Sequence, residues 1–304
     1  MLKESLPQQI QEQVEVLKTT RPEDFSQAYD SCVDLDLPEQ LLKDTITAVN
    51  NGEIVGVVIP HQSFGDVEVV RHFCKKINDL SAETIESYEA YSLPAVGVSI
   101  KDFFESRRKE YEKENLNMIG VIREIDKDHP KYSKSIDSEM KQKSQEEMRQ
   151  LVEAFKGDKG FVLFIPFEST LQSGRTNPET GQIYGMQKVS PEDSLLGNLI
   201  KRRKKRKINI LPCAIDGGYK ILHPGTHSFS PEFIDLLRNK KDSDTKVVTA
   251  KASTLINISH PDYLTRSEEE IFTEIVTEIA QNLPPEAHGD YKGLIPQSSR
   301  INLL

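Results

Sequence analysis

The chain has 304 residues, of which 37% are apolar and 29% charged, and its formal net charge is −9. This composition excludes collagen-like and wholly disordered chains, and the negative balance argues against a general nucleic-acid binder, because phosphate contacts need clustered cations. No apolar run approaches the roughly 18 residues that cross a bilayer, and the N-terminal stretch lacks the apolar core of a signal peptide. The three cysteines form no CxxC pair, which predicts buried, reduced thiols. We therefore expect a cytoplasmic protein, and any contact with a membrane must be peripheral.

The first 45 residues are predicted to form a short helical N-terminal segment. The stretch "PQQIQEQVEVLK" carries apolar residues at helical spacing. The stretch "PEQLLKDTITAVNNG" does the same and closes with Asn51 and Gly52, a typical helix stop. We accordingly expect a helical segment over 1–45 and a main domain over 46–304.

Short apolar runs in the main domain predict buried strands, and helical stretches separate them. The runs are "EIVGVVIP", "NMIGVIREID", "GFVLFIPF" and "INILPCAI", with a further strand and flanking loop at "YSLPAVGVSI". Helices are expected at "VEVVRHFCKKIND", at "SKSIDSEMKQKSQEEMRQLVEAFKGDKG" and at "SEEEIFTEIVTEIAQNL", the last capped by Ser267. The stretch "KDFFESRRKEYEKEN" is either a charged helix or a mobile segment. This alternation predicts an α/β fold with a largely parallel mixed sheet flanked by helices.

One stretch of low complexity, "KRRKKRK", places seven cations in a row. They are Lys201, Arg202, Arg203, Lys204, Lys205, Arg206 and Lys207. Three interpretations stay open: a solvated loop, a docking patch for anionic lipid or an acidic carrier protein, and a nuclear localisation signal.

A histidine and an aspartate follow the first predicted strand of the main domain, at His61 and Asp66. Ligands of α/β sheets bind beyond the carboxyl ends of the strands. An imidazole there can take a proton from a substrate hydroxyl if a carboxylate holds its other ring nitrogen. The alternative is a surface histidine beside a helix-capping aspartate, since such a pair arises by chance in many proteins.

Two further segments can supply positive charge to the same edge. The loop over 166–185 follows the strand "GFVLFIP", is rich in hydroxyls and contains Gly174 and Arg175, a set suited to a phosphate. Arg123 and Lys127 follow the strand "NMIGVI". The alternatives are a long turn and ordinary surface cations.

The order of these blocks resembles the glycerolipid acyltransferase superfamily, which includes the glycerol-3-phosphate and 1-acylglycerol-3-phosphate (lysophosphatidate) acyltransferases. His61 to Asp66 match its His-x-x-x-x-Asp block, and "GVIREIDK" matches its Gly-x-Ile strand leading to a basic residue. "PFEST" stands at its Pro-Glu-Gly-Thr turn, and "ILPCAI" fits its Ile/Val-x-Pro-x-Ala-Ile strand. The loop "SGRTNPETGQIY" is similar to the acceptor loop of soluble plastid-type members, and the tail "IAQNLPPEAHGDY" to the C-terminal helix and turn of bacterial ones. The resemblance spans residues 50–292.

The chain departs from the family pattern at four places, which leaves the identity of the acceptor open. Pro60 stands where many members have Asn, and Ser169 replaces the Gly after Glu168. No Arg follows Thr170 directly; the nearest is Arg175. The second block carries a glutamate among its cations.

The resemblance implies transfer of an acyl group from a thioester of coenzyme A or acyl carrier protein to an alcohol, with 46–304 as the acyltransferase domain. His61 would be the general base and Asp66 would orient it. Arg123, Arg175 and Lys127 would grip the acceptor phosphate. The loop residues that would support the acceptor are Glu168, Ser169, Thr170, Ser173 and Gly174. No metal or other cofactor is implied, and the histidines show no ligand spacing.

The sequence leaves three functions open. The first is acylation of glycerol-3-phosphate in phospholipid biosynthesis. The second keeps the chemistry but uses lysophosphatidate or another alcohol. The third is a non-catalytic module that binds an acyl carrier or an anionic membrane through the basic run.

Overall fold

A computed structural model of the chain describes residues 19–61, 65–94, 101–122, 133–166, 188–222 and 229–294, together with Gln13, Val16, Leu17, Lys127 and Met186. Residues 101–106 and 193 are described by their backbone alone.

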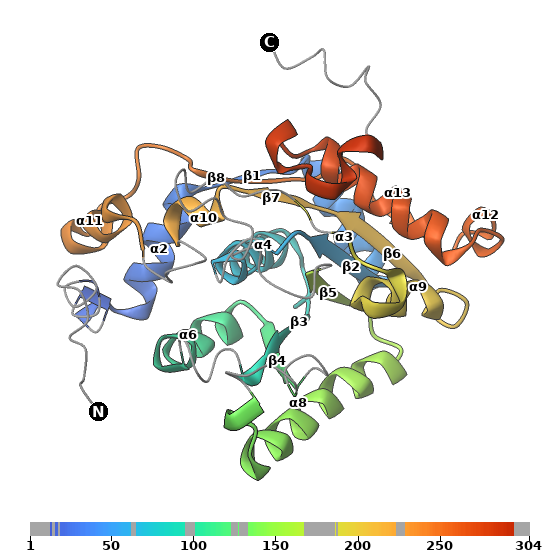
Figure 1. The fold of residues 1–304 in the computed structure, drawn as a ribbon, viewed down its shortest axis with the longest axis horizontal. Helices are drawn as coiled ribbons and strands as arrows, with labels where there is room; N and C mark the ends of the chain where they lie inside the picture. Colours follow the sequence, from blue (N-terminus) through green and yellow to red (C-terminus); the bar gives the residue numbers. More distant parts are fainter. Residues whose placement is uncertain are drawn as a thin grey trace.

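Helices and strands alternate along most of the chain, as Figure 1 shows. The strands are β1 (Val33–Asp36), β2 (Ile54–Ile59), β3 (Ser87–Ser92), β4 (Leu116–Val121), β5 (Phe161–Pro166), β6 (Ile208–Pro212), β7 (Ala214–Asp216), β8 (Val248–Lys251) and β9 (Ile256–Asn257). The α-helices are α2 (Pro22–Cys32), α3 (Glu39–Asn50), α4 (Asp66–Leu80), α6 (Lys101–Lys113), α8 (Ser138–Lys156), α9 (Leu195–Arg202), α10 (Gly218–Ile221), α11 (Pro231–Asn239), α12 (Pro261–Leu264) and α13 (Glu268–Gln281). Short 3₁₀ helices are η1 (Ser133–Ser135), η3 (Pro191–Asp193), η4 (Pro285–Ala287) and η5 (Gly289–Leu294).

The main sheet has six strands in the order β4-β3-β5-β2-β6-β9. Its first five strands are parallel, and β9 is antiparallel to β6. β2 lies between β5 and β6 and is buried at all six positions, as expected of a strand covered on both faces. The predicted α/β fold with a largely parallel mixed sheet is therefore confirmed.

A second sheet has three strands in the order β1-β8-β7. β1 is parallel to β8, and β7 is antiparallel to it. β7 begins two residues after β6 ends, and the amide of Cys213 between them donates to the carbonyl of Val58 on β2, at 2.9 Å. The two sheets are therefore joined through one continuous segment of the chain.

Helices cover both faces of the main sheet, because its strands alternate their side chains between two apolar clusters. Val55 and Val57 of β2 belong to the cluster that α2, α4, α6 and α11 help to build. Ile54 and Val58 belong to the other, to which α9 and α13 contribute. In Figure 1 the first group of helices lies on the left and α8, α9 and α13 lie on the right.

The prediction of a helical segment over 1–45 was incomplete. β1 lies within that range and pairs with β8, and α3 runs across the predicted boundary. Phe25 and Tyr29 of α2 are buried in the same apolar cluster as the main sheet. The helices α2 and α3 and the strand β1 therefore pack as part of the core.

Candidate active site

His61 lies at the carboxyl end of the central strand β2, separated from it by Pro60 alone. The neighbouring parallel strands end level with it, since Ile59 pairs in register with Pro166 of β5 and Val58 with Pro212 of β6. The buried apolar run of β2 thus carries the chain straight to the sheet edge, and the proline ends the strand there. This places the imidazole at the edge where α/β sheets bind ligands.

The edge beside His61 is a topological switch point. The helix after β2, α4, packs on one face of the sheet, whereas the helix after β5, α9, packs on the other. The connections leaving these adjacent strands therefore diverge, and such a divergence opens the crevice in which open α/β sheets hold their ligands. The two strands that meet at this point are β2, which His61 follows, and β5, which ends at Pro166.

His61 and Asp66 are within hydrogen-bonding distance, with Nδ1 of the ring 3.2 Å from Oδ2 of the carboxylate. The imidazole is 25% exposed and the carboxylate 3% exposed. An ionised carboxylate can only accept a hydrogen bond, so Nδ1 carries the proton and Nε2 is the basic nitrogen. Asp66 is also the first residue of α4, where the helix dipole favours negative charge.

A second carboxyl group, Glu89 of β3, is buried near this pair. Burial first, and the negative charge of Asp66 second, raise the pKa of Glu89 to about 8. Glu89 therefore carries a proton at neutral pH while Asp66 supports the histidine. A buried carboxyl group with a raised pKa is a recurrent feature of catalytic sites. The sequence analysis missed Glu89, because a single glutamate in the strand "SYEAYS" has no distinguishing pattern.

The residues predicted to bind the acceptor phosphate are only partly within the described structure. Lys127 is helical and exposed. Arg123 and the loop residues Glu168, Ser169, Thr170, Ser173, Gly174 and Arg175 lie outside the described residues. Their segments leave β4 and β5 at the same edge as His61. With strands about 4.8 Å apart, the β5 segment starts next to β2 and the β4 segment starts about 14 Å away.

The basic run lies at the opposite, amino edge of the main sheet, directly before β6. Arg206 donates to five backbone carbonyls, those of Gly52, Ala154, Phe155, Gly157 and Lys159. Arg203 is buried and donates to the carbonyl of Ile200, in the helix it follows, and to that of Arg266, before α13. The interpretation of the run as a loop of seven solvated cations is wrong for these two arginines, which bind backbone at helix ends and strand starts.

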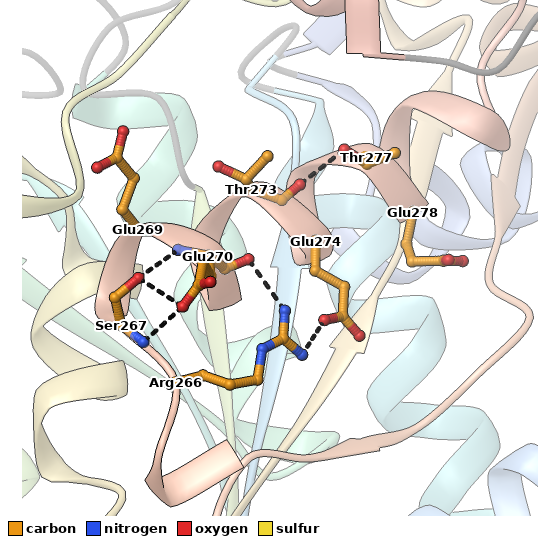
Figure 2. Close-up of a pocket in the computed structure, with 8 residues that line it drawn as sticks. All are labelled: Arg266, Ser267, Glu269, Glu270, Thr273, Glu274, Thr277 and Glu278. Carbon is orange, nitrogen blue, oxygen red and sulfur yellow. Dashed lines mark hydrogen bonds and ion pairs between the residues drawn. The ribbon is translucent and has the colours of Figure 1, made fainter. Parts of the chain in front are cut away.

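The exposed face of α13 forms an open groove with an acidic lining (Figure 2). Its polar groups largely satisfy one another: Ser267 and Glu270 form the capping box, and Arg266 pairs with Glu274. The prediction that Ser267 caps this helix is confirmed. The groove is the solvated side of one amphipathic helix, and we assign it no chemistry.

The described residues contain no group of His, Cys, Asp and Glu arranged to hold a metal ion. Within the same residues, no helix combines the length and apolarity that crossing a bilayer requires.

Comparison of the sequence with models of known protein families gives no match, and comparison with curated proteins gives none either.

Proposed function

We propose that this protein is a glycerolipid O-acyltransferase of phospholipid biosynthesis, which moves a fatty acyl group from a coenzyme A or acyl-carrier-protein thioester to the hydroxyl of glycerol-3-phosphate. The observation that supports this most is the His61–Asp66 pair at the carboxyl end of β2, at the switch point with β5. The resemblance of the motifs to the acyltransferase family supports the proposal as well. We propose that the protein acts in the cytoplasm.

The proposed reaction needs one base and no covalent acyl-enzyme. Nε2 of His61 takes the proton of the acceptor hydroxyl as its oxygen attacks the thioester carbonyl carbon. The carbon–sulfur bond then breaks, and the departing thiolate takes the proton from the imidazolium. Asp66 stabilises that imidazolium between the two transfers. General-base catalysis contributes roughly 10²–10⁴ in rate, and the positioning of thioester and alcohol contributes much of the rest.

The acceptor phosphate would be held by the cations of the same edge. A guanidinium presents a planar fork that matches a phosphate, which suits Arg123 and Arg175 to this role. Lys127 would add a point charge, and the hydroxyls of Thr170 and Ser173 would donate hydrogen bonds. Glu168 would repel a phosphate, so its role would be to accept from an acceptor hydroxyl or to hold an arginine.

The test is release of free thiol from palmitoyl-coenzyme A in the presence of glycerol-3-phosphate. We expect release that depends on the acceptor and falls by roughly 10²–10⁴-fold in His61→Ala and in Asp66→Asn. His260→Ala, which removes the exposed imidazole at the N-cap of α12, is the matched control and should keep the full rate. Equal rates in wild type and His61→Ala would refute the proposal.

The same assay separates the acceptors. Glycerol-3-phosphate, lysophosphatidate and glycerol differ in the acyl chain and in the phosphate, so their relative kcat/KM values report which group the site requires. A preference for lysophosphatidate would support the second member of the family. Absence of acyl transfer to every acceptor would leave the non-catalytic binding module.

A further inference from the structure

The first turn of α4 carries two buried carboxylates with different surroundings. Asp66 faces His61, whereas Glu68, two residues later, is turned into a cluster of cations. Residues two apart on a helix point in different directions. The helical turn that carries Asp66 is therefore also held by the contacts that Glu68 makes on another side of the helix.

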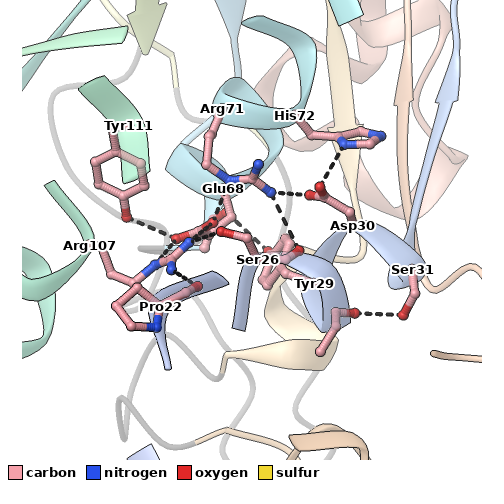
Figure 3. Close-up of polar contacts among 12 residues, drawn as sticks. Pro22, Ser26, Tyr29, Asp30, Ser31, Glu68, Arg71, His72, Arg107 and Tyr111 are labelled. Atoms are coloured by element: carbon pink, nitrogen blue, oxygen red, sulfur yellow. Dashed lines mark hydrogen bonds and ion pairs between the residues drawn. The ribbon is translucent and has the colours of Figure 1, made fainter. Parts of the chain in front are cut away.

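Glu68 is held by three side chains (Figure 3). Arg107 of α6 donates to both of its oxygens, at 3.0 and 2.9 Å, and Tyr111 of α6 donates at 2.9 Å. Arg71 of α4 itself donates at 3.0 Å. Burial alone would raise the pKa of Glu68, but the charges of Arg107 and Arg71 hold it below the usual value. The carboxylate therefore stays ionised and fully bonded inside the core.

The N-terminal helix α2 closes this cluster from the other side. Arg107 donates to the hydroxyl of Ser26 at 2.5 Å and to the carbonyl of Pro22, and Arg71 pairs with Asp30. These contacts join α2, α4 and α6 (Figure 3), and Ser26, Glu68, Arg71 and Arg107 are buried. Removing one partner of such a cluster leaves a buried charge uncompensated.

A separate hydrogen bond from α2 reaches the residue that begins α4. The hydroxyl of Tyr29, which is fully buried, donates to the carbonyl of Gly65 at 3.0 Å. The same carbonyl accepts from the amide of Glu68 at 3.0 Å, the first bond of the helix. Gly65 occupies the N-cap position and has no side chain with which to cap the helix. The hydroxyl of Tyr29 thus attaches the residue that begins α4 to helix α2.

We infer that Tyr29 and Glu68 are positioning residues for the His61–Asp66 pair, so that helix α2 is part of the proposed catalytic apparatus. This inference rests on the proposed function. Tyr29 holds the peptide that precedes Asp66, and Glu68 holds the turn that follows it. Together they set the direction in which the Asp66 carboxylate meets the imidazole. Small displacements of such a pair lower the rate steeply, because proton transfer needs close alignment.

The decisive variant is Tyr29→Phe, which keeps the ring and its contacts with Phe25 and Phe233 and removes only the hydroxyl. We expect kcat to fall about tenfold with the KM for the acceptor unchanged, because the substrate contacts are intact and the alignment of the base is not. We also expect faster amide hydrogen exchange at residues 66–69, with exchange in α13 unchanged. Glu68→Gln should act in the same direction and more strongly. Tyr263→Phe, which removes a hydroxyl bonded to Glu274, is the control.

Two results would overturn the inference. One is an active wild-type enzyme whose kcat is unaltered by Tyr29→Phe. The other is unaltered exchange at residues 66–69 in that variant, whatever the activity. A wild-type protein that releases no thiol would instead refute the proposed function, and the exchange measurement would still decide whether Tyr29 holds the turn.

Discussion

Replacing Glu89 by Gln should stabilise the protein in a manner that depends on pH. Glu89 is only 6% exposed, and its Oε2 atom has no hydrogen-bond partner in the described structure. Among the described residues, the groups that interact electrostatically with it include Asp66 and Cys74 of α4 and Tyr111 of α6. Burial first, and the charge of Asp66 second, favour the protonated form in the folded protein, with a pKa of about 8.

The sign and size of the effect follow from linkage. An unfolded glutamate has a pKa of 4.5, so between pH 4.5 and 8 the folded state binds a proton that the unfolded state releases. The free energy of unfolding then falls by about 1.4 kcal/mol for each pH unit, which amounts to about 3 kcal/mol at pH 7. Glutamine does not titrate, so the variant does not undergo this fall in the free energy of unfolding. The stability of Glu89→Gln relative to wild type should therefore increase from pH 5 to pH 8 and level off above it.

Urea denaturation of both proteins at several pH values between 5 and 9 measures this difference directly. Glu83→Gln, in the exposed connection before β3, is the control and should track the wild type at every pH. The effect is independent of any substrate. A difference in unfolding free energy that stays constant across this range would refute the assignment of a neutral, buried Glu89.

Three further predictions concern parts of the molecule away from the candidate site. Arg206→Ala should destabilise the fold by about 3 kcal/mol in chemical denaturation, since it deprives five carbonyls of a charged donor, whereas Lys204→Ala in the same run should change it by less than about 0.5 kcal/mol. Gly197→Ala should lower the free energy of unfolding by about 3 kcal/mol, because a Cβ there would lie 1.7 Å from the carbonyl oxygen of Pro191. Gly293→Ala is its control, since a Cβ there would meet nothing within 4 Å. Equal melting temperatures for the two variants would contradict the packing at α9. Changing the exposed lysines of the basic run to Gln should weaken binding to anionic vesicles severalfold in a sedimentation assay, and the loss should be larger at low salt. Unchanged binding would exclude the run as a membrane contact. These lysines are Lys201, Lys204, Lys205 and Lys207.

The elements that sequence reasoning placed correctly are those whose signal is local. β2, β5 and β6 are continuous apolar runs, and α13 has both an apolar stripe and a capping box within its own residues. The missed strands β1, β8 and β9 have two to four residues each. Their pairing joins residues far apart in the chain, and so short a stretch has no periodicity to read.

Two predictions were incomplete for the same physical reason, which is a partner supplied by a distant segment. The stretch "YSLPAVGVSI" was predicted as a strand with a flanking loop. Its first two residues end β3, which begins earlier, at Ser87, where β4 and β5 offer it backbone partners on both sides, and residues 95–100 lie outside the described part of the chain. The stretch "KDFFESRRKEYEKEN" was predicted as a charged helix or a mobile segment. It forms α6 and buries Arg107, because Glu68 of α4 neutralises that guanidinium. A charge pattern alone does not tell a solvated cation from a paired one.

The candidate site was predictable in part for the same reason. His61 and Asp66 are close in sequence and directly follow a strong strand signal, so their proximity could be expected. Tyr29, Glu68 and Glu89 come from three elements, and only the tertiary fold brings α2, α4 and β3 to one place. Their chemistry arises from burial, which a linear sequence does not display.

The two ends of the main sheet bear on the choice of acceptor. His61 lies at the carboxyl end of β2 and the exposed lysines of the basic run lie beyond its amino end. β2 has six residues, so at about 3.3 Å per residue the two ends are about 20 Å apart. A membrane that contacted those lysines would hold the imidazole at least that far from the lipid headgroups. An acceptor that remains embedded in the bilayer could not reach the base in this orientation, whereas glycerol-3-phosphate, which diffuses in water, could.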